Sequence, residues 1–270
     1  MQHEIVDKRT DCWRQEQTTK TLEEQIQQEL DSLNRKLNES MDRPTAMGLS
    51  NLPMVIQDLN LSSQQVVGKV GDLIKFSDKY KQCIETTAGN ALFNVIVDTD
   101  ETASRIMGEM ADKKLGRITF MPLNRIGKFA DINYPGNEDG EFIPLIKKIQ
   151  FNKELDNCMK LIFAKTVVVK ELNTGVSLAK KYGLNAVTPD GDRVDGRGAL
   201  TGGFNDVFGK NGGKNSTNRL DCLINLREKK EELKEVESDL NKIEEELKQF
   251  DSEADAMNAV SYTHLTLPTN

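Results

Sequence analysis

PDGDRVDGRGALTGGF, residues 189–204, contains five glycines in sixteen positions. Asp190-Gly191 predicts a hairpin turn, and Ala199–Thr201 predicts a short strand that follows it. Gly202 and Gly203 lack a Cβ, so another backbone could lie close to that strand. An uncovered sheet edge is a liability in a soluble protein, so the strand predicts a pairing surface. A tight turn inside one subdomain is the alternative explanation for the glycines.

Two phosphate-binding patterns fail in this region. A Walker loop requires GxxxxGK[ST], but Gly209-Lys210 and Gly213-Lys214 are each followed by Asn and lack the upstream glycine. A dinucleotide fingerprint requires GxGxxG, and Thr201 stands where its third glycine would fall. The glycines therefore indicate close backbone packing rather than nucleotide binding.

Upstream, two segments repeat one order of elements: a β-branched strand, an amphipathic helix, a glycine, and a second strand ending at a proline. They are Val95–Val97, Asp100–Lys113, Gly116 and Arg117–Met121, then Val167–Val169, Leu172–Tyr182, Gly183 and Asn185–Thr188. A further helix precedes each segment, at 78–88 and 152–163. Alternating strands and helices predict βαβ-type units on mixed sheets, hence two related subdomains joined by the polar stretch 127–141.

Both ends of the chain predict long helices with a narrow apolar stripe. Apolar residues recur at steps of three and four, which is the coiled-coil pattern. The predicted seam is Leu22, Ile26, Leu30, Leu33 and Leu37, then Leu226, Leu233, Val236, Leu240, Ile243 and Leu247. So narrow a stripe suits one partner helix, so we predict an antiparallel pair within the chain. Two helices packed separately on the middle region are the alternative.

The last ten residues, SYTHLTLPTN, look unlike the acidic heptads before them and resemble translated vector sequence. We expect them not to continue the helix, and we treat 258–270 as a non-native tail. His264 lies there, which leaves His3 as the only other histidine. The four cysteines are far apart and form no CxxC, which predicts reduced thiols and no metal site.

Composition and charge narrow the function classes. Hydrophobic residues make up 37% and charged residues 29%, and no apolar run approaches the ~18 residues of a membrane helix. The net charge of −7 is uneven, with −3 over residues 1–43 and −6 over 218–257, which leaves the middle at +2. The acidic total therefore does not exclude a polyanionic partner for the middle region.

The motifs DGDRVDGRGALTGG and GRITFMPLNR, with the heptad helices beside them, resemble the hinge of SMC (structural maintenance of chromosomes) proteins. The stretches DKYKQCIETTAGNALFNVIVDTDETA and GRITFMPLNRI most resemble third-type SMC subunits of eukaryotic cohesin. The resemblance covers about residues 1–257. It implies an α/β (α+β) SMC-hinge-like head of two similar subdomains on an antiparallel two-helix coiled coil. The expected boundaries are 1–43 (helix), 44–126 (subdomain), 127–141 (linker), 142–217 (subdomain) and 218–257 (helix).

The resemblance also implies partners. In this family hinges dimerise, so we expect a heterodimer with the first-type cohesin SMC subunit, kleisin and other cohesin subunits in the full complex, sister-chromatid cohesion, and a nuclear, chromosomal location. ATP and Mg²⁺ belong to head domains that this segment lacks, so no cofactor is expected here. Some relatives carry a basic residue where Gly196 stands, which weakens any DNA-binding role for that position.

The expected dimer interface combines the glycine strand with a strand of the first subdomain. Its residues are Gly198, Ala199, Leu200, Thr201, Gly202 and Gly203, with Arg117, Ile118, Thr119, Phe120 and Met121. Weak, non-specific DNA binding through phosphates is expected near Arg193, Arg197, Lys147 and Lys148. No aromatic residue is interleaved among these to stack on bases.

The competing interpretation is an α/β enzyme with coiled-coil dimerisation. Such an enzyme needs a catalytic constellation, and the sequence offers no Ser/His/Asp set, no Cys/His set and no metal cluster. We therefore expect a non-catalytic domain.

Overall fold

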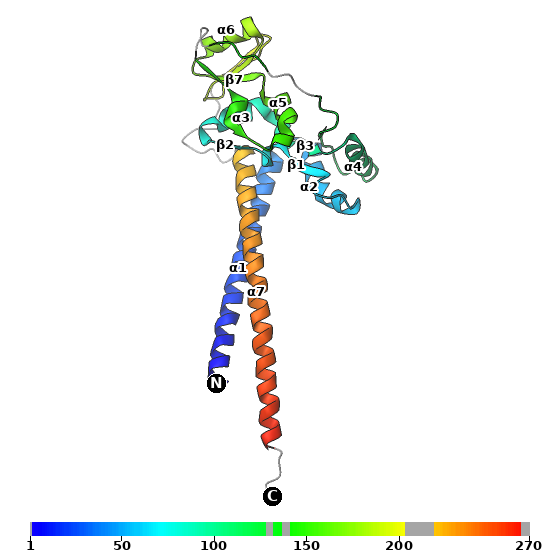
Figure 1. Ribbon diagram of the computed structural model, residues 1–270, viewed down its shortest axis with the longest axis vertical. Coiled ribbons are helices and arrows are strands. Elements are labelled where there is room, and N and C mark those ends of the chain that lie inside the picture. The colour runs from blue at the N-terminus through cyan, green and yellow to red at the C-terminus, as the bar shows by residue number, and fades with distance from the viewer. Residues whose placement is uncertain (1, 128–131, 137–140, 203–218, 266–270) are drawn as a thin grey trace. The chain divides into compact units, whose positions relative to one another are not determined.

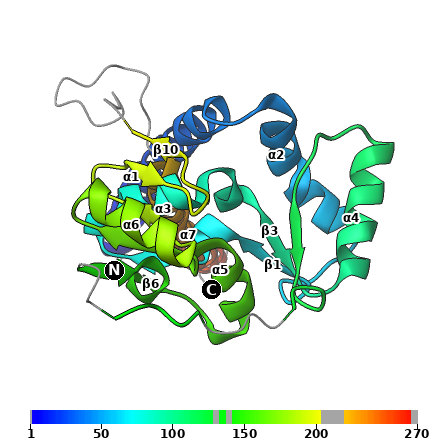
Figure 2. The ribbon, with the colours of Figure 1, turned by 90° about the horizontal axis from the view of Figure 1, so that it is seen from above.

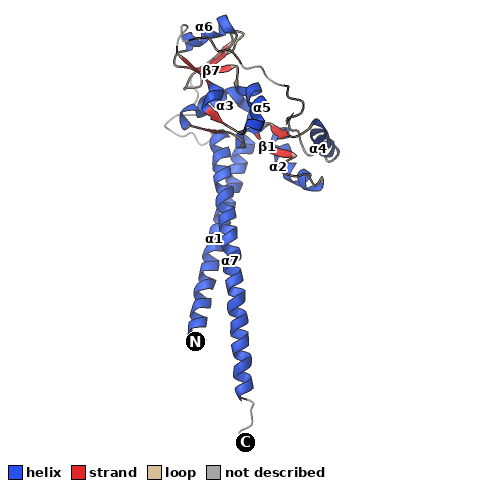
Figure 3. Cartoon of the chain, in the orientation of Figure 1, coloured by secondary structure: helices blue, strands red, loops and turns tan. Residues whose placement is uncertain are grey.

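The computed structural model describes residues 2–127, 132–136, 141–202 and 219–265, with backbone alone for 2–6 and 254–265. Two compact units are present. One combines Met1–Arg35 with Asn225–Asn270, and the other is Lys36–Ile224. In the parts described, the first unit is helical throughout, whereas the second mixes helices and short strands (Figure 3).

The helical unit is an antiparallel pair formed by α1 (Gln2–Glu39) and α7 (Arg219–Leu265) (Figure 1). Three interhelix ion pairs fix its direction: Arg9–Asp251 at 2.8 Å, Lys20–Glu244 at 3.6 Å and Glu29–Lys229 at 2.9 Å. Residue numbers rise along one helix as they fall along the other. Exposed ion pairs stabilise little by themselves, but their order confirms the predicted intrachain antiparallel pair.

Most of the predicted seam is buried or half-buried. Ile26, Leu30, Leu37, Leu226 and Val236 are buried, and Leu33, Leu233, Leu240, Ile243 and Leu247 are half-buried.

Leu22 was wrongly placed in the seam, since it is 42% exposed. One heptad before Ile26 and Leu30 come Thr19 and Glu23, which are half-buried. Leu22 is therefore one position off the stripe, and its four-residue distance from Ile26 was misleading. The seam instead continues to the buried Cys12, whose Sγ lies 3.6 Å from a Glu246 carboxylate oxygen.

The helix continues further than the sequence predicted. The expectation that SYTHLTLPTN leaves the helix was wrong for its first half, because α7 runs to Leu265. Nothing in SYTHL breaks a helix, and the first proline after it is Pro268. The non-native origin of residues 258–270 stays a prediction.

The second unit contains a three-stranded sheet of β1 (Val66–Lys69), β3 (Val95–Val97) and β4 (Phe120–Pro122), in the order β1-β3-β4. β3 pairs antiparallel with β1 and parallel with β4. The parallel pair is joined through α4 (Asp100–Asp112), which packs with α2 (Arg43–Asp58) beside this sheet (Figure 2). Leu52, Val55, Val95, Val97 and Ile106 form its core.

A five-stranded sheet has the order β10-β9-β8-β7-β5. Its strands are β5 (Phe142–Pro144), β7 (Thr166–Val169), β8 (Asn185–Val187), β9 (Arg193–Val194) and β10 (Leu200–Thr201). In this sheet β7 and β8 pair in parallel, the other described pairs are antiparallel, and α6 (Leu172–Tyr182) connects β7 with β8. The core under α6 includes Val167, Val169, Leu178, Ala186 and Val194.

The duplicated order predicted from the sequence is therefore present: β3-α4-β4 matches β7-α6-β8. The helices expected before each repeat are α3 (Lys81–Ala88) and α5 (Asp156–Phe163), which pack against each other. β2 (Lys75–Phe76) pairs with β6 (Ile149–Gln150), so the two halves of the sequence share a small sheet. In addition, the Cys83 thiol donates to the Thr188 carbonyl at 3.5 Å. The subdomain boundaries stay a prediction.

The two helix-ending glycines differ. Gly183 ends α6 in the left-handed region at φ 64°, as predicted. Gly116 does not end α4, whose C-cap is Lys113, and Lys114 takes the positive φ instead. A Cβ at Gly116 would lie 2.4 Å from the backbone nitrogen of Gly48. This glycine is therefore required by the close approach of α2 rather than by helix termination.

Candidate interface at two sheet edges

The glycine-rich stretch folds as two successive hairpins. In the first, the Gly191 N–H donates to the Thr188 carbonyl at 3.0 Å, and the Thr188 N–H donates to the Asp192 carbonyl at 2.9 Å. Gly191 has φ +93°, which a glycine adopts without steric cost. The predicted Asp190-Gly191 hairpin turn is thus confirmed, and it pairs β8 with β9.

The second hairpin places β10 at the end of the five-stranded sheet. The Gly198 N–H donates to the Asp195 carbonyl at 2.8 Å, and Gly198 has φ +96°. The glycine at position 198 is therefore explained by a turn within the chain, and no partner is needed to explain it. Leu200 follows in β10 opposite Val194 and is 59% exposed, an unusual exposure for a large apolar side chain in a sheet.

The residues flanking Leu200 are also exposed, namely Ala199, Thr201 and Gly202. A Cβ built on Gly202 would lie 2.7 Å from a carboxylate oxygen of Asp192. Gly202 is therefore restricted by its own hairpin, so a substitution there would disturb more than a partner contact. Gly203 lies outside the described residues.

The second predicted contact, Arg117–Met121, coincides only in part with a strand. β4 begins at Phe120, whereas the Arg117 N–H donates to the Pro44 carbonyl of α2 at 2.9 Å. Ile118 packs against the core beside α2, and Arg117 and Thr119 are exposed. Among the described strands β4 stands at one end of its sheet, as β10 does in the other.

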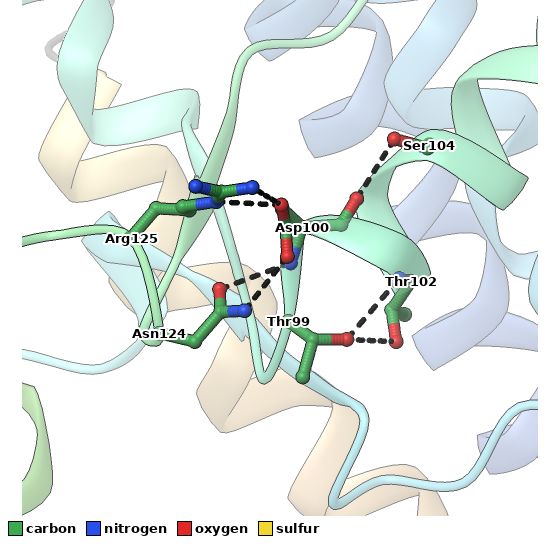
Figure 4. A network of polar contacts seen from close by, with 6 residues as sticks. All are labelled: Thr99, Asp100, Thr102, Ser104, Asn124 and Arg125. Carbon is green, nitrogen blue, oxygen red and sulfur yellow. Dashed lines mark hydrogen bonds and ion pairs between the residues drawn. The ribbon is translucent and has the colours of Figure 1, made fainter.

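A polar network fixes the end of β4 against the start of α4 (Figure 4). The Asn124 amide accepts from the Asp100 N–H at 3.0 Å and donates to its carboxylate at 2.7 Å. Arg125 donates to the same carboxylate at 2.6 Å, and these bonds hold the pKa of Asp100 below its ordinary value. Thr99 caps the helix by accepting from the Thr102 N–H at 3.2 Å. These bonds join the segment that follows β4 to the N-terminus of α4.

The four predicted DNA-proximal residues fall into two places. Arg193 is in β9 and Arg197 is in the turn before β10, at one end of the sheet. Lys147 and Lys148 are in a 3₁₀ turn that follows β5, at the other end. Their ammonium groups lie 5.8 Å from the rings of Tyr134 and Tyr80 respectively. The structure therefore does not bring the four into one cluster.

The candidate interface consists of strand edges and packed side chains. Within the described residues, no group of three or more His, Cys, Asp or Glu side chains could hold a metal ion. The four cysteines are buried, and burial raises the pKa of Cys83 to about 11, which leaves the thiol protonated at neutral pH.

One polar cluster was missed in the sequence. The Glu85 carboxylate accepts from the Arg219 N–H at 3.2 Å, at the first residue of α7, and Lys81 pairs with Asp221 at 2.6 Å. Burial raises the pKa of Glu85 above its ordinary value. The only signal in the sequence is the helical spacing of Lys81 and Glu85, which does not reveal a partner more than 130 residues away.

The two units together define a class of protein. It has a duplicated α/β domain whose sequence lies between two helical segments, and these two segments pair antiparallel. Comparison with known proteins agrees. Residues 63–179 match the family model of the SMC proteins' flexible hinge domain. The chain therefore belongs to the SMC hinge family, which supports its interpretation as a non-catalytic dimerisation domain.

Individual relatives narrow this assignment. Structural maintenance of chromosomes protein 3 of Saccharomyces cerevisiae is 41% identical over 94% of this chain and 20% of that protein. Chromosome segregation protein sudA of Emericella nidulans is 35% identical over 82% of this chain and 17% of its own length. A solved structure described as the folded elbow of cohesin matches with TM-score 0.84 and 40% identity, over 95% of this chain and 36% of that one.

The segment is accordingly an SMC hinge similar to that of structural maintenance of chromosomes protein 3, and it spans about a fifth of the length of the curated relative from S. cerevisiae. In the described residues, no helix is long and apolar enough to cross a membrane.

Proposed function

We propose that this segment is the hinge through which a cohesin SMC subunit pairs with the hinge of the first-type SMC subunit. The ring so formed, with kleisin and the other cohesin subunits, would hold sister chromatids together on nuclear chromosomes. One observation carries the proposal: among the described strands, β10 ends the five-stranded sheet and β4 ends the three-stranded sheet, and β10 presents Leu200 at 59% exposure.

The two edges suit a ring of two hinges. Edge strands present unpaired backbone groups that another strand can complete. A duplicated head has two such edges, so a partner with the same fold can contact one edge of each kind and close the ring. The interface positions in β10 and β4 remain part of this proposal.

Leu200 offers a cleaner test than the glycines, because Gly202 also contacts Asp192 within its own hairpin. Leu200→Glu should weaken binding to a first-type hinge by at least tenfold, since burying the leucine is worth about 1.5–3 kcal/mol and tenfold corresponds to about 1.4 kcal/mol. Sedimentation of mixtures would measure it. Leu161→Glu, at a leucine of α5 that is 51% exposed, is the matched control. Equal affinities for the two variants would place the interface elsewhere.

Weak DNA binding is a second part of the proposal, favoured by the charge of +2 on the middle region. Arg193→Glu with Arg197→Glu should reduce affinity and flatten the log–log salt dependence, because each lost phosphate contact removes about 0.9 of slope. Lys147→Glu with Lys148→Glu tests the other end of the sheet separately. Unchanged binding and slope in both double variants would remove all four residues from the DNA site.

A further inference from the structure

A pocket of about 290 Å³ lies beside β5, at the end of the five-stranded sheet opposite to β10. Apolar walls come from Tyr80, Phe142, Ile143, Val168, Val169 and Pro189. Two lysines and one glutamate, Lys79, Lys170 and Glu141, complete the lining. Because β5 and β10 are separated by three strands, this pocket is independent of the hinge contact proposed at β10.

The pocket has an aliphatic floor. Ile143 pairs with Val168 in the register of β5 and β7, and Ile143 remains 37% exposed. Neighbouring strand residues point to opposite faces, and Val167 and Val169 pack in the core under α6. Ile143 and Val168 therefore face away from α6, and an apolar group placed on them would be removed from water.

The rim of the pocket is positively charged. The ammonium groups of Lys79 and Lys148 each lie 5.8 Å from the centre of the Tyr80 ring, a geometry that attracts a cation to the ring. Lys170 pairs with Glu141 at the edge of the same pocket. Lys79 and Lys170 line the pocket together with Glu141, and Lys148 lies outside the lining but beside Tyr80, so cations outnumber the carboxylate here and favour a ligand that carries acidic groups.

We propose that this pocket binds a short acidic segment of a partner protein. One bulky apolar side chain of the segment would fill the floor at Ile143 and Val168, while Asp or Glu side chains on either side would meet Lys79, Lys148 and Lys170. Nucleic acid fits less well, because the Tyr80 ring is engaged by two ammonium groups rather than left clear to stack on a base.

The test uses the full chain and two fluorescein-labelled peptides of equal charge, DEDLFEDE and DEDSSEDE, in fluorescence anisotropy. The first should bind at least tenfold more tightly, because only it carries an apolar anchor. Ile143→Asp, and separately Lys79→Glu with Lys148→Glu, should each weaken its binding at least tenfold. Val176→Asp is the matched control, on α6 across the sheet and 40% exposed, and Lys180→Glu with Lys234→Glu controls for total charge.

Several outcomes would overturn the proposal. These are no binding of DEDLFEDE at millimolar concentration, equal binding of the two peptides, or equal effects of the pocket and control variants. Displacement of the peptide by a fifteen-residue oligo-dT would assign the pocket to single-stranded nucleic acid instead. Circular dichroism melting checks that each variant is folded. If Ile143→Asp unfolds the head, Ile143→Ser must still weaken DEDLFEDE binding, or the proposal fails.

Discussion

The guanidinium of Arg219 donates a hydrogen bond to the Ser40 carbonyl at 2.7 Å, although 179 positions separate the two residues. The same guanidinium donates to Asn90 at 3.0 Å and lies 5.8 Å from the centre of the Phe93 ring. The first residue of α7 is therefore tied both to the residue that follows α1 and to the 3₁₀ helix after α3.

Removing this link should destabilise the unit formed by Lys36–Ile224. Arg219→Ala deletes two hydrogen bonds from a charged donor, and one such bond is typically worth about 1.5–3 kcal/mol. We expect urea unfolding to show a loss of at least that size, whereas Lys230→Ala, at an exposed site on α7, should change stability by less than about 0.5 kcal/mol. Similar midpoints for the two variants would contradict the structural role of Arg219.

Glu85 should make stability depend on pH. Burial, the largest influence, raises its folded pKa above the unfolded value, so its contribution is fully present below the unfolded pKa and is lost as pH rises through the folded pKa. Glu85→Gln keeps an acceptor for the Arg219 N–H without the charge. The variant should therefore melt higher than the parent at pH 7, and the difference should shrink toward pH 4. A pH-independent difference would show that the charge of Glu85 is irrelevant.

Gly196 should tolerate no side chain. A Cβ there would lie 2.3 Å from the Gly183 carbonyl oxygen, a backbone atom that cannot move aside cheaply. Gly196→Ala should cost about 1–3 kcal/mol of unfolding free energy. Gly108→Ala is the matched control, because a Cβ there would meet no atom within 4 Å apart from its neighbours and the backbone of its own helix, and inside α4 it should stabilise by about 0.5–1 kcal/mol. If Gly196→Ala left the free energy of unfolding unchanged, the loops that contain Gly183 and Gly196 would be able to move apart without cost.

The helical pair should crosslink within one chain. Glu29 and Lys229 meet across the two helices at 2.9 Å, so cysteines at both positions should react with a short bismaleimide to give a monomeric product. Cysteines at positions 29 and 242 should not, because residue 242 is about 20 Å further along α7 at 1.5 Å per residue. Dimeric products alone, seen in denaturing gels, would reject the intrachain pair.

Regular patterns made much of this fold predictable. Leu172–Tyr182 was predicted with its observed bounds, because an apolar period of 3.6 runs directly into a glycine. Leu22 was misplaced because one four-residue step cannot distinguish a seam position from its neighbour. Gly116 was misread because the atoms that require a glycine there belong to α2, more than 60 residues earlier. Local spacing carries no information about such distant contacts.

The same limit applied to the candidate sites. The Asp190-Gly191 hairpin was visible because turn chemistry is local. The contact between Glu85 and Arg219 was not visible in the sequence, because neither residue shows its role without the other. The pocket at Ile143 depends on which of two alternating faces α6 covers, and that choice is made by tertiary packing.

The bond from Arg219 to Ser40 has a mechanical consequence. The chain enters the Lys36–Ile224 unit and leaves it at adjacent points. A force that separates these two points would act first on this bond, on the hydrogen bond from the Arg219 N–H to Glu85, and on the Lys81–Asp221 ion pair. It would reach the strands of either sheet only afterwards. The junction would then break first, while the edge strands β4 and β10 kept their conformation. Single-molecule stretching between Ser40 and Arg219 would register that junction as an early, small extension ahead of the rupture of the sheets.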